Sequence, residues 1–369
     1  MTYLSKRHDG ALPSAGFDVV EARLREVDGA EWDGFAAACS APYCAAYASL
    51  RAVRAKHVLR ERLRLIRVYR WRNGVRVQIG QCAIRWAGME GRFVGGLQLL
   101  PSESADWSAA MAAILAHAGA GHYRYGGSWN PEEDRSPVLG TMVGVTVDHV
   151  RPLTVQGVDF SRWPSWDAYW RATSTNIQRN ARYAEERIEG LAIENFEARG
   201  ALIQMRRMTR LRARTYRRKA LYLNSVIWAF SQMIDIAFYR RMVAISFSRA
   251  GRSDLACQFN VHFGGSTYYL FGGSDAAASG ASWYLMRDVL HRAYQRNPNG
   301  RFVMGPVDYA LHDEAVGGGL LRSRRSCRVS DWQTAVVDFH YAPPTVSDRL
   351  PPMPLVPQQV PVGEEGIAA

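Results

Sequence analysis

The segment from Leu255 to Phe263 alternates between apolar and polar residues, which predicts a β-strand with two chemically different faces. The apolar face would pack into a core. The polar face carries Gln258, Asn260 and His262, and it either faces water or lines a substrate cleft. In a cleft, Gln258 and Asn260 would bind substrate through hydrogen bonds, and His262 would act as a general base.

A second candidate site is a run of small residues from Gly272 to Ser282, between a predicted strand at 267–273 and a predicted helix at 281–295. Small residues let a ligand approach the backbone, and the free N–H groups at a helix start attract anions. We therefore predict a phosphate site at Ser279, Gly280, Ala281 and Ser282. A flexible loop before a Ser-capped helix explains the same residues.

Three polar residues, Asp308, His312 and Asp313, follow the short predicted strand 302–304. Residues at the end of a strand can face a cleft, so Asp308 is a second candidate general base, acting directly or through water. A solvent-exposed loop is the alternative for all three residues.

The segment 205–219 contains no carboxylate and eight basic residues. On a helix they would cover most of the surface, apart from an apolar strip at Leu202, Met205 and Met208. A solvated helix face is one interpretation, and contact with RNA phosphates is the other. The basic residues are Arg206, Arg207, Arg210, Arg212, Arg214, Arg217, Arg218 and Lys219.

The composition is that of a globular protein, with 369 residues, 47% hydrophobic residues and a formal charge of +12. The positive charge favours an anionic partner, such as coenzyme phosphates or RNA. We find neither a membrane-spanning apolar run nor a signal peptide and expect a cytoplasmic protein. The five cysteines form no C-x-x-C pair, so we expect reduced thiols and no metal site.

The elements that must position these residues form two predicted lobes, at 17–140 and 141–342, between disordered ends at 1–16 and 343–369. The lobes would join in the Pro/Gly-rich segment 126–140. Predicted helices lie near 30, 46–60, 106–118, 166–190, 200–220, 227–242 and 281–295. Predicted strands lie at 63–71, 75–86, 92–100, 123–125, 192–197, 243–248, 254–263, 267–273, 302–304 and 333–339.

The order strand, strand, helix, strand occurs twice. Its elements begin at 77, 92, 106 and 123 in the first lobe, and at 255, 267, 281 and 301 in the second. We interpret this as a divergent internal duplication. The predicted fold class is α/β (α+β), with two tandem lobes that each contain a mixed, mostly antiparallel sheet flanked by helices.

The second lobe resembles GNAT acyltransferases of the FemAB-like and cellulose-biosynthesis (CelD/BcsL-like) branch. Three stretches over about residues 165–330 carry the resemblance. Residues 174–190 resemble the helix motif S-x-x-x-R-x-x-x-R-x-A-x-x-x-G, residues 268–275 resemble the strand end Y-Y-x-x-G-G-S, and residues 319–327 resemble the ending G-L-x-x-F-K-x-x-F.

The resemblance implies two tandem GNAT-like lobes and direct transfer of an acyl group from acyl-CoA (acetyl-CoA) to a small-molecule or peptide amine. Neither a metal nor a covalent enzyme intermediate is expected. A second hypothesis is transfer from aminoacyl-tRNA, as in FemAB enzymes, with tRNA as a partner. A third is a non-catalytic nucleic-acid or protein-binding module on a decayed GNAT scaffold.

The resemblance also assigns residues. We predict Tyr269 of the Y-Y strand as catalytic, together with His262 and Asp308, and Trp283 and Arg324 as substrate-binding. Arg324 stands where the family has Lys, and a solvated basic turn is the alternative for it. The GNAT phosphate loop has the form R/Q-x-x-G-x-G/A, but Ala277 occupies its first position here. The corresponding first-lobe loop, 101–106, contains two carboxylates that would repel phosphate, so we place the donor site in the second lobe.

Overall fold

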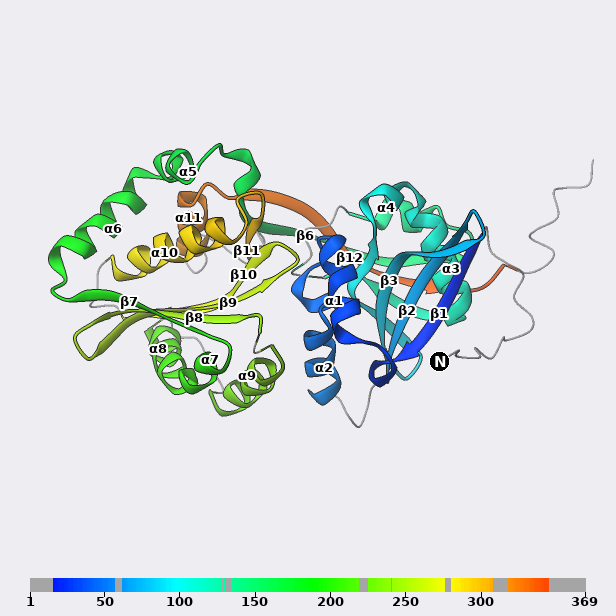
Figure 1. Ribbon diagram of the computed structural model, residues 1–369, viewed down its shortest axis with the longest axis horizontal. Helices are drawn as coiled ribbons and strands as arrows, with labels where there is room; N and C mark the ends of the chain where they lie inside the picture. The colour runs from blue at the N-terminus through cyan, green and yellow to red at the C-terminus, as the bar shows by residue number, and fades with distance from the viewer. Residues whose placement is uncertain are drawn as a thin grey trace, which may run out of the picture.

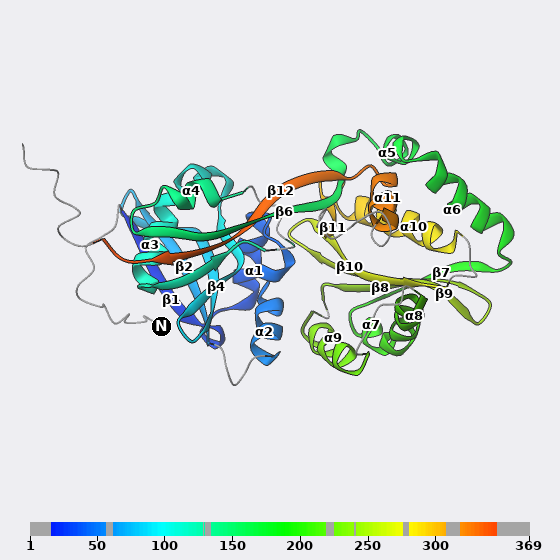
Figure 2. The same ribbon diagram turned by 180° about the vertical axis from the view of Figure 1, so that it is seen from behind.

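The computed structural model describes residues 16–56, 62–127, 129, 134–218, 225–239, 241–275, 280–307 and 318–344, which form two lobes lying side by side (Figure 1). One 12-stranded sheet runs through both, in the order β1-β2-β3-β4-β5-β12-β6-β11-β10-β9-β8-β7. The long central strands β6 (Val145–Asp159) and β12 (Ser330–Tyr341) pass between the lobes (Figure 2). Of the predicted disordered ends, 1–16 and 343–369, residues 1–15 and 345–369 lie outside the described residues.

The first lobe packs its helices against five strands around a core that includes Ile66, Ile114 and Phe339. Its elements in chain order are β1 (Phe17–Arg23), α1 (Gly29–Ala38), the 3-10 turn η2 (Tyr43–Ala45), α2 (Tyr47–Lys56), β2 (Arg62–Arg72), β3 (Val75–Ala87), β4 (Glu90–Leu99), the 3-10 turn η3 (Pro101–Asp106), α3 (Trp107–Ala118), β5 (Gly121–Tyr125) and α4 (Ser136–Gly140).

The second lobe has helices on both faces of its sheet: α5, α6, α10 and α11 cover one face, and α7, α8 and α9 cover the other (Figure 1). Its further elements are α5 (Trp166–Ala172), α6 (Thr175–Arg187), β7 (Leu191–Glu197), α7 (Arg199–Ile203), α8 (Met205–Arg218), α9 (Ser225–Tyr239), β8 (Val243–Ala250), β9 (Ser253–Phe263), β10 (Ser266–Ser274), α10 (Ala281–Arg296), β11 (Arg301–Val307) and α11 (Gly318–Ser326).

The two lobes repeat one topology. In the first, β4 leads through α3 to β5, and β4 and β5 pair in parallel. In the second, β10 leads through α10 to β11, again a parallel pair. The strands on either side of the central β12–β6 pair follow opposite orders in the sheet. The predicted fold class, two α/β lobes with mixed, mostly antiparallel sheets, is confirmed.

The central strands depart from the predicted organisation. No strand is predicted from the sequence at 145–159, where Pro152 and Gly157 interrupt the apolar pattern, yet β6 pairs with β12 from Val145 to Gly157. The end of β12, from Val337 to Tyr341, pairs with β5 and so completes the first lobe. The chain therefore returns to the first lobe after the boundary that we predicted near residue 140.

The helix predicted at 166–190 is wrong, because the structure contains two helices there. Thr173 is extended, with ψ of 164°, and ends α5. Ser174 then begins α6, since its hydroxyl accepts a hydrogen bond from the N–H of Asn176 at 3.3 Å. The side chain of Gln178 fills the break by donating to the carbonyls of Trp170 and Thr173.

Aromatic rings join the lobes. Tyr43 of η2 packs against Tyr268 of β10, with ring centroids 5.0 Å apart, and against Trp129 at 6.1 Å. Near them, the Nζ atom of Lys56 lies 2.6 Å from a carboxylate oxygen of Asp235. These contacts hold α2 of the first lobe against α9 of the second.

The first-lobe counterpart of the predicted phosphate loop is η3, and it contains a buried carboxylate, that of Glu103. The carboxylate of Glu103 is 2% exposed, and its oxygens lie 3.0 Å from Arg70 and 2.5 Å from Arg72. Asp106 also pairs with Arg70, at 2.8 Å. The two predicted carboxylates are therefore neutralised by arginines of β2, and a side chain already binds the cations that could attract a phosphate.

Replacement of Glu103 by Gln is expected to lower the free energy of unfolding by about 2 kcal/mol, because Arg70 and Arg72 lose the buried charge that they share. Urea denaturation measures the change. The matched control is Glu90→Gln, since Glu90 pairs with Arg92 at the surface, with 38% of its side chain exposed. That change should stay within about 0.5 kcal/mol. Equal losses in both variants would contradict the interpretation.

Candidate functional site

The parallel pairing of β10 and β11 is short. Only Thr267 with Phe302 and Tyr268 with Val303 are in register, although the strands continue to Ser274 and Val307. A bulge in β10 lies just beyond, between Tyr269 and Phe271. On the β11 side, the backbone of β10 after Tyr268 therefore has no strand partner among the described residues. Such groups can hydrogen-bond an extended ligand.

Two glycines of β10 are required by close packing on opposite faces of the sheet. A Cβ atom on Gly272 would lie 2.6 Å from the hydroxyl of Tyr269, whose ring covers its own strand on the α10 face. A Cβ atom on Gly273 would lie 2.8 Å from the backbone nitrogen of Arg212, so α8 rests directly on the other face. The two glycines thus bring Tyr269 and α8 to the unpaired end of β10.

Tyr269 lies at this unpaired end. Its ring stacks on Phe302 of β11, with centroids 6.5 Å apart, and therefore bridges the two strands. Burial raises the pKa of Tyr269 to about 12, and nearby Cys257 adds to the rise. The hydroxyl consequently stays protonated at neutral pH and can donate a hydrogen bond.

Arg324 lies near Tyr269 but binds backbone. Its side chain is 8% exposed, and it donates to the carbonyl oxygens of Met304 at 2.5 Å, Pro306 at 3.1 Å and Gly305 at 3.2 Å. The solvated alternative is therefore wrong for Arg324, whose guanidinium holds the end of β11, although Arg322 and Arg325 beside it are exposed. Gln258, beside Gly272 in register, is also buried, with its amide nitrogen 3.6 Å from the sulfur of Met286.

The start of α10 lies at the same end of β10. Gly280 precedes the helix with φ of +85°, and the first turn has neither a side-chain cap nor an acidic residue. A Cβ atom there would meet the carbonyl of Asn180 in α6, so the position requires glycine. Ala281 is fully buried, Ser282 is half-buried, and Trp283 packs against the core under α10. Ser279 lies outside the described residues.

Ala277 stands where the GNAT phosphate loop has Arg or Gln, but two arginines of α8 lie beside the same loop. Arg214 pairs with Asp275 at 3.1 Å, and Arg218 lies 3.4 Å from the hydroxyl of Ser274. Both arginines are exposed at the end of β10, next to the predicted phosphate loop. The basic run was visible in the sequence, but its position beside the loop depends on tertiary packing.

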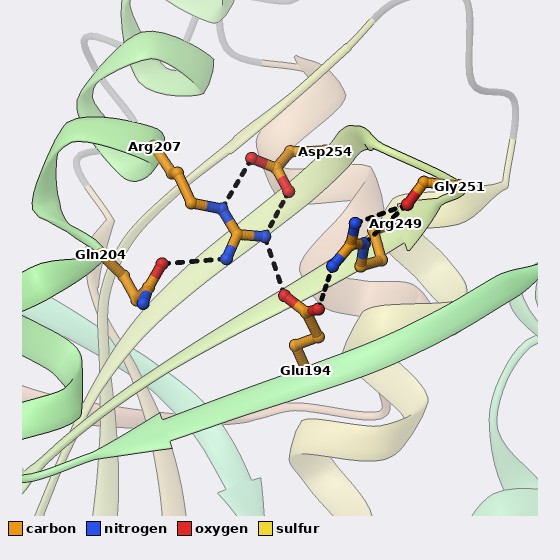
Figure 3. Close-up of polar contacts among 6 residues, drawn as sticks. All are labelled: Glu194, Gln204, Arg207, Arg249, Gly251 and Asp254. Atoms are coloured by element: carbon orange, nitrogen blue, oxygen red, sulfur yellow. Dashed lines mark hydrogen bonds and ion pairs between the residues drawn. The ribbon is translucent and has the colours of Figure 1, made fainter.

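Part of the basic run is structural, which corrects its interpretation as a fully solvated face. Arg207 bridges Asp254 of β9, at 2.9 Å, and Glu194 of β7, at 2.9 Å (Figure 3). Glu194 also pairs with Arg249. Arg212 is buried, and its guanidinium lies over the ring of Phe271 at 4.6 Å. The exposed remainder of α8 consists of Arg206, Arg210, Arg214, Arg217 and Arg218.

The polar face of β9 is covered by α10 rather than by water. Asn260 and His262 line a cavity of about 250 Å³ between this strand and the helix. Nδ1 of His262 lies 2.9 Å from the hydroxyl oxygen of Thr267. Burial lowers the pKa of His262 to about 3, and the charge of Arg296 contributes. The ring is therefore neutral at physiological pH and is a weak base.

The predicted site residues thus fall into three groups. Tyr269 and Arg324 lie where β10 and β11 separate, with Gln258 of β9 in register with Gly272 of the same strand end; Gly280 to Trp283 form the start of α10, and Asn260 and His262 lie in the separate cavity. Asp308 lies outside the described residues, as do His312 and Asp313.

Trp129 was not predicted from the sequence as a residue near the site, yet its ring would lie 2.7 Å from a Cβ atom on Gly305 of β11. Its position in a Pro/Gly-rich segment gave no signal for that contact.

Neither a metal site nor a membrane-spanning helix is found among the residues that the structure describes. No three His, Cys, Asp or Glu side chains there are grouped closely enough to hold a metal ion. Within the same part of the chain, no helix combines the length and apolar character needed to cross a membrane.

Comparisons with known proteins identify a domain family and similar folds. Residues 171–310 match the family model of the acetyltransferase (GNAT) domain. The chain is similar to the crystal structure of FemX, with a TM-score of 0.64 and 10% identity, covering 86% of this chain and 96% of FemX. It is also similar to a conserved protein of unknown function from Bacteroides thetaiotaomicron, with a TM-score of 0.51 and 9% identity, covering 85% and 98%. No curated protein sequence matches significantly.

The match places a GNAT-type acetyltransferase domain in the second lobe, and on this ground the protein is an acyltransferase. The family match covers α6 to β11, which are the elements that build the unpaired end of β10 and the start of α10. The likeness to FemX spans both lobes, and at 10% identity it concerns the fold alone.

Proposed function

We propose that the protein transfers an acyl group from acyl-CoA directly to an amine where β10 and β11 separate. The observation that carries this proposal is the parallel pair that stops after Tyr268, with a bulge, the start of α10 and two exposed arginines at the same strand end. This combination provides unpaired backbone groups for the acyl arm and positive potential for the phosphates.

The residues present fit a phosphate-bearing donor. The N–H groups in the first turn of α10 would bind the pyrophosphate of acyl-CoA, and Arg214 and Arg218 would supply its counter-charges. Gly280 lets the start of α10 pack against the carbonyl of Asn180 in α6, which fixes the position of these N–H groups. Acyl-CoA would supply an activated thioester carbonyl.

Acyl transfer requires that the amine be aligned with the thioester carbonyl and that this carbonyl be polarised. The amine nitrogen attacks the carbonyl carbon, so that a C–N bond forms and the C–S bond breaks. The released thiolate takes up the proton that the amine loses. Backbone N–H groups of β10 would polarise the carbonyl, and the protonated hydroxyl of Tyr269 would donate a hydrogen bond to the developing negative charge. Because the low pKa of His262 makes it a weak base, we assign it no proton transfer.

The direct test is thiol release from acetyl-CoA and longer acyl-CoAs in the presence of small-molecule and peptide amines, together with calorimetric titration of CoA. We expect CoA to bind and at least one amine to accelerate thiol release. Absence of CoA binding together with inactivity across the panel would contradict the proposal.

Charge reversal of Arg218 to Glu is expected to weaken CoA binding about 10-fold, because it removes one charge-assisted contact with phosphate and adds repulsion. Calorimetry at fixed ionic strength measures the change. Arg206→Glu is the matched control, since Arg206 is exposed on the same helix but lies about 18 Å away along its axis. Similar weakening in both variants would indicate only a general charge effect.

A second candidate function is transfer from aminoacyl-tRNA, within the FemAB-like branch. The exposed arginines of α8 favour it, since they continue from the donor loop along the helix and could bind RNA phosphates. This hypothesis predicts tRNA binding that weakens steeply with salt and after charge reversal at Arg210 and Arg214. If charged tRNA neither binds nor donates its aminoacyl group, this function is excluded.

A further inference from the structure

We infer that the cavity between α10 and strands β7, β8 and β9 binds a small carboxylate that also carries a hydroxyl or amide N–H group. The cavity measures about 250 Å³. This site is separate from the acyl-transfer site, and its occupancy does not depend on the proposed function. The residues that line it are Asn195, Glu197, Ala244, Ser246, Asn260, His262, Val289, Arg292, Gln295 and Arg296.

The inner end of the cavity has an unsatisfied acceptor. Asn260 is 1% exposed, and its Oδ1 atom has no hydrogen-bond partner. A buried polar atom without a partner destabilises the fold, so a ligand that donates a hydrogen bond to it gains affinity.

The inner end also favours an uncharged donor. His262 lies beside Asn260 on the same face of β9, and Nδ1 of its neutral ring is engaged with Thr267. Glu197 is the one carboxylate among the lining residues, and it is already paired with Arg296. An ammonium group would therefore have to compete with Arg296 for this carboxylate, which is more costly than burial of a hydroxyl or amide.

The outer end of the cavity is positively charged. Arg292 and Arg296 of α10 line it, and their side chains are 51% and 44% exposed. Glu197, which pairs with Arg296, is the one carboxylate among the lining residues. Asp288, the partner of Arg292, is not part of the lining. Two cations and one anion leave a net positive charge, and exposed ion pairs are weak enough for a ligand carboxylate to share the guanidinium groups.

The position of the cavity separates it from the donor site. It lies along the second half of α10, from Val289 to Arg296, whereas the predicted phosphate site is at Ala281. The helix rises about 1.5 Å per residue, so Arg296 lies about 22 Å from that first turn. A ligand in the cavity and a phosphate at the helix start can therefore bind together.

Three matched probes test the chemistry on the full chain: 3-hydroxybutanoate, butanoate without the hydroxyl donor, and 3-hydroxybutanamide without the carboxylate. Titration calorimetry should show 3-hydroxybutanoate binding at least 10-fold more tightly than either other probe. Saturating CoA should leave its affinity unchanged. Equal affinities for the three probes, or no binding by any hydroxyalkanoate of three to six carbons, overturns the inference.

Variants locate the site. Asn260→Leu removes the buried acceptor, and Arg296→Gln removes one of the two cations. Because the Arg296 side chain is exposed, the second variant should fold and therefore tests the site even if the first does not fold. Each should weaken 3-hydroxybutanoate binding at least 10-fold. Ser248→Ala is the control for Asn260, because Ser248 is fully buried with an unpartnered hydroxyl but lies outside the cavity lining. Wild-type affinity in Arg296→Gln overturns the assignment.

Discussion

Replacement of Tyr269 by Phe is expected to lower kcat for acyl transfer about 100-fold, the effect typical of losing one donor to a developing oxyanion. The ring that bridges β10 and β11 remains, and only the hydroxyl is lost. Because burial raises the pKa of Tyr269 to about 12, the wild-type hydroxyl is a permanent donor at physiological pH. Steady-state kinetics should therefore show a lower kcat with little change in KM for the acyl donor.

The matched control for this variant is Tyr268→Phe. Tyr268 is the preceding residue of the same strand, but its ring packs on the opposite face, against Tyr43. We expect its kcat to stay within about threefold of wild type, since its hydroxyl is remote from the α10 face. An equal loss in both variants would show that Tyr269 acts through the stability of β10 rather than through the reacting atoms.

The nature of the donor changes the expected size of the Tyr269 effect. A thiol with a pKa near the ~8.5 of free cysteine leaves readily as a thiolate and needs little help from a hydroxyl of pKa about 12. An oxygen ester, as in aminoacyl-tRNA, releases an alkoxide that needs a proton. A Tyr269→Phe defect that is larger with oxygen esters would thus favour the second candidate function.

The local elements of the second lobe could be predicted because their sequence patterns are complete within each element. The alternation from Leu255 to Phe263 identifies β9, and the small residues before Ala281 identify the start of α10. Tyr269 was singled out by its motif, and the structure places it at the unpaired end of β10. Each of these predictions depends on residues that are close in sequence.

Other features depend on long-range contacts and could not be predicted. Nothing local indicates that the arginines at the end of α8 lie beside Ser274 and Asp275, since Gly273 must first admit the α8 backbone. The polar face of β9 likewise has a pattern that fits solvent or a cleft equally well. Only the packing of α10 shows that it is covered, with Asn260 and His262 lining the cavity beneath the helix.

Because His262 is buried as a neutral ring, we expect the free energy of unfolding to decrease at acid pH. Its pKa is lowered from 6.5 to about 3 in the native state, so the native state favours the neutral ring. This contribution is fully present above pH 6.5, the value for the unfolded chain, and is lost as the pH falls towards 3. Between pH 7 and pH 4, the unfolded chain binds a proton that the native state excludes, which corresponds to about 3 kcal/mol.

His262→Gln removes this titration while keeping a polar side chain beside Thr267. Urea denaturation from pH 7 to pH 4 should therefore show that the free energy of unfolding falls about 3 kcal/mol less in the variant than in the wild type. Ionisable groups such as Glu197 and Arg296, which flank the ring across the cavity, are common to both proteins and largely cancel in the difference. Parallel pH profiles would mean that water reaches the ring and that His262 titrates normally, which would restore it as a candidate base.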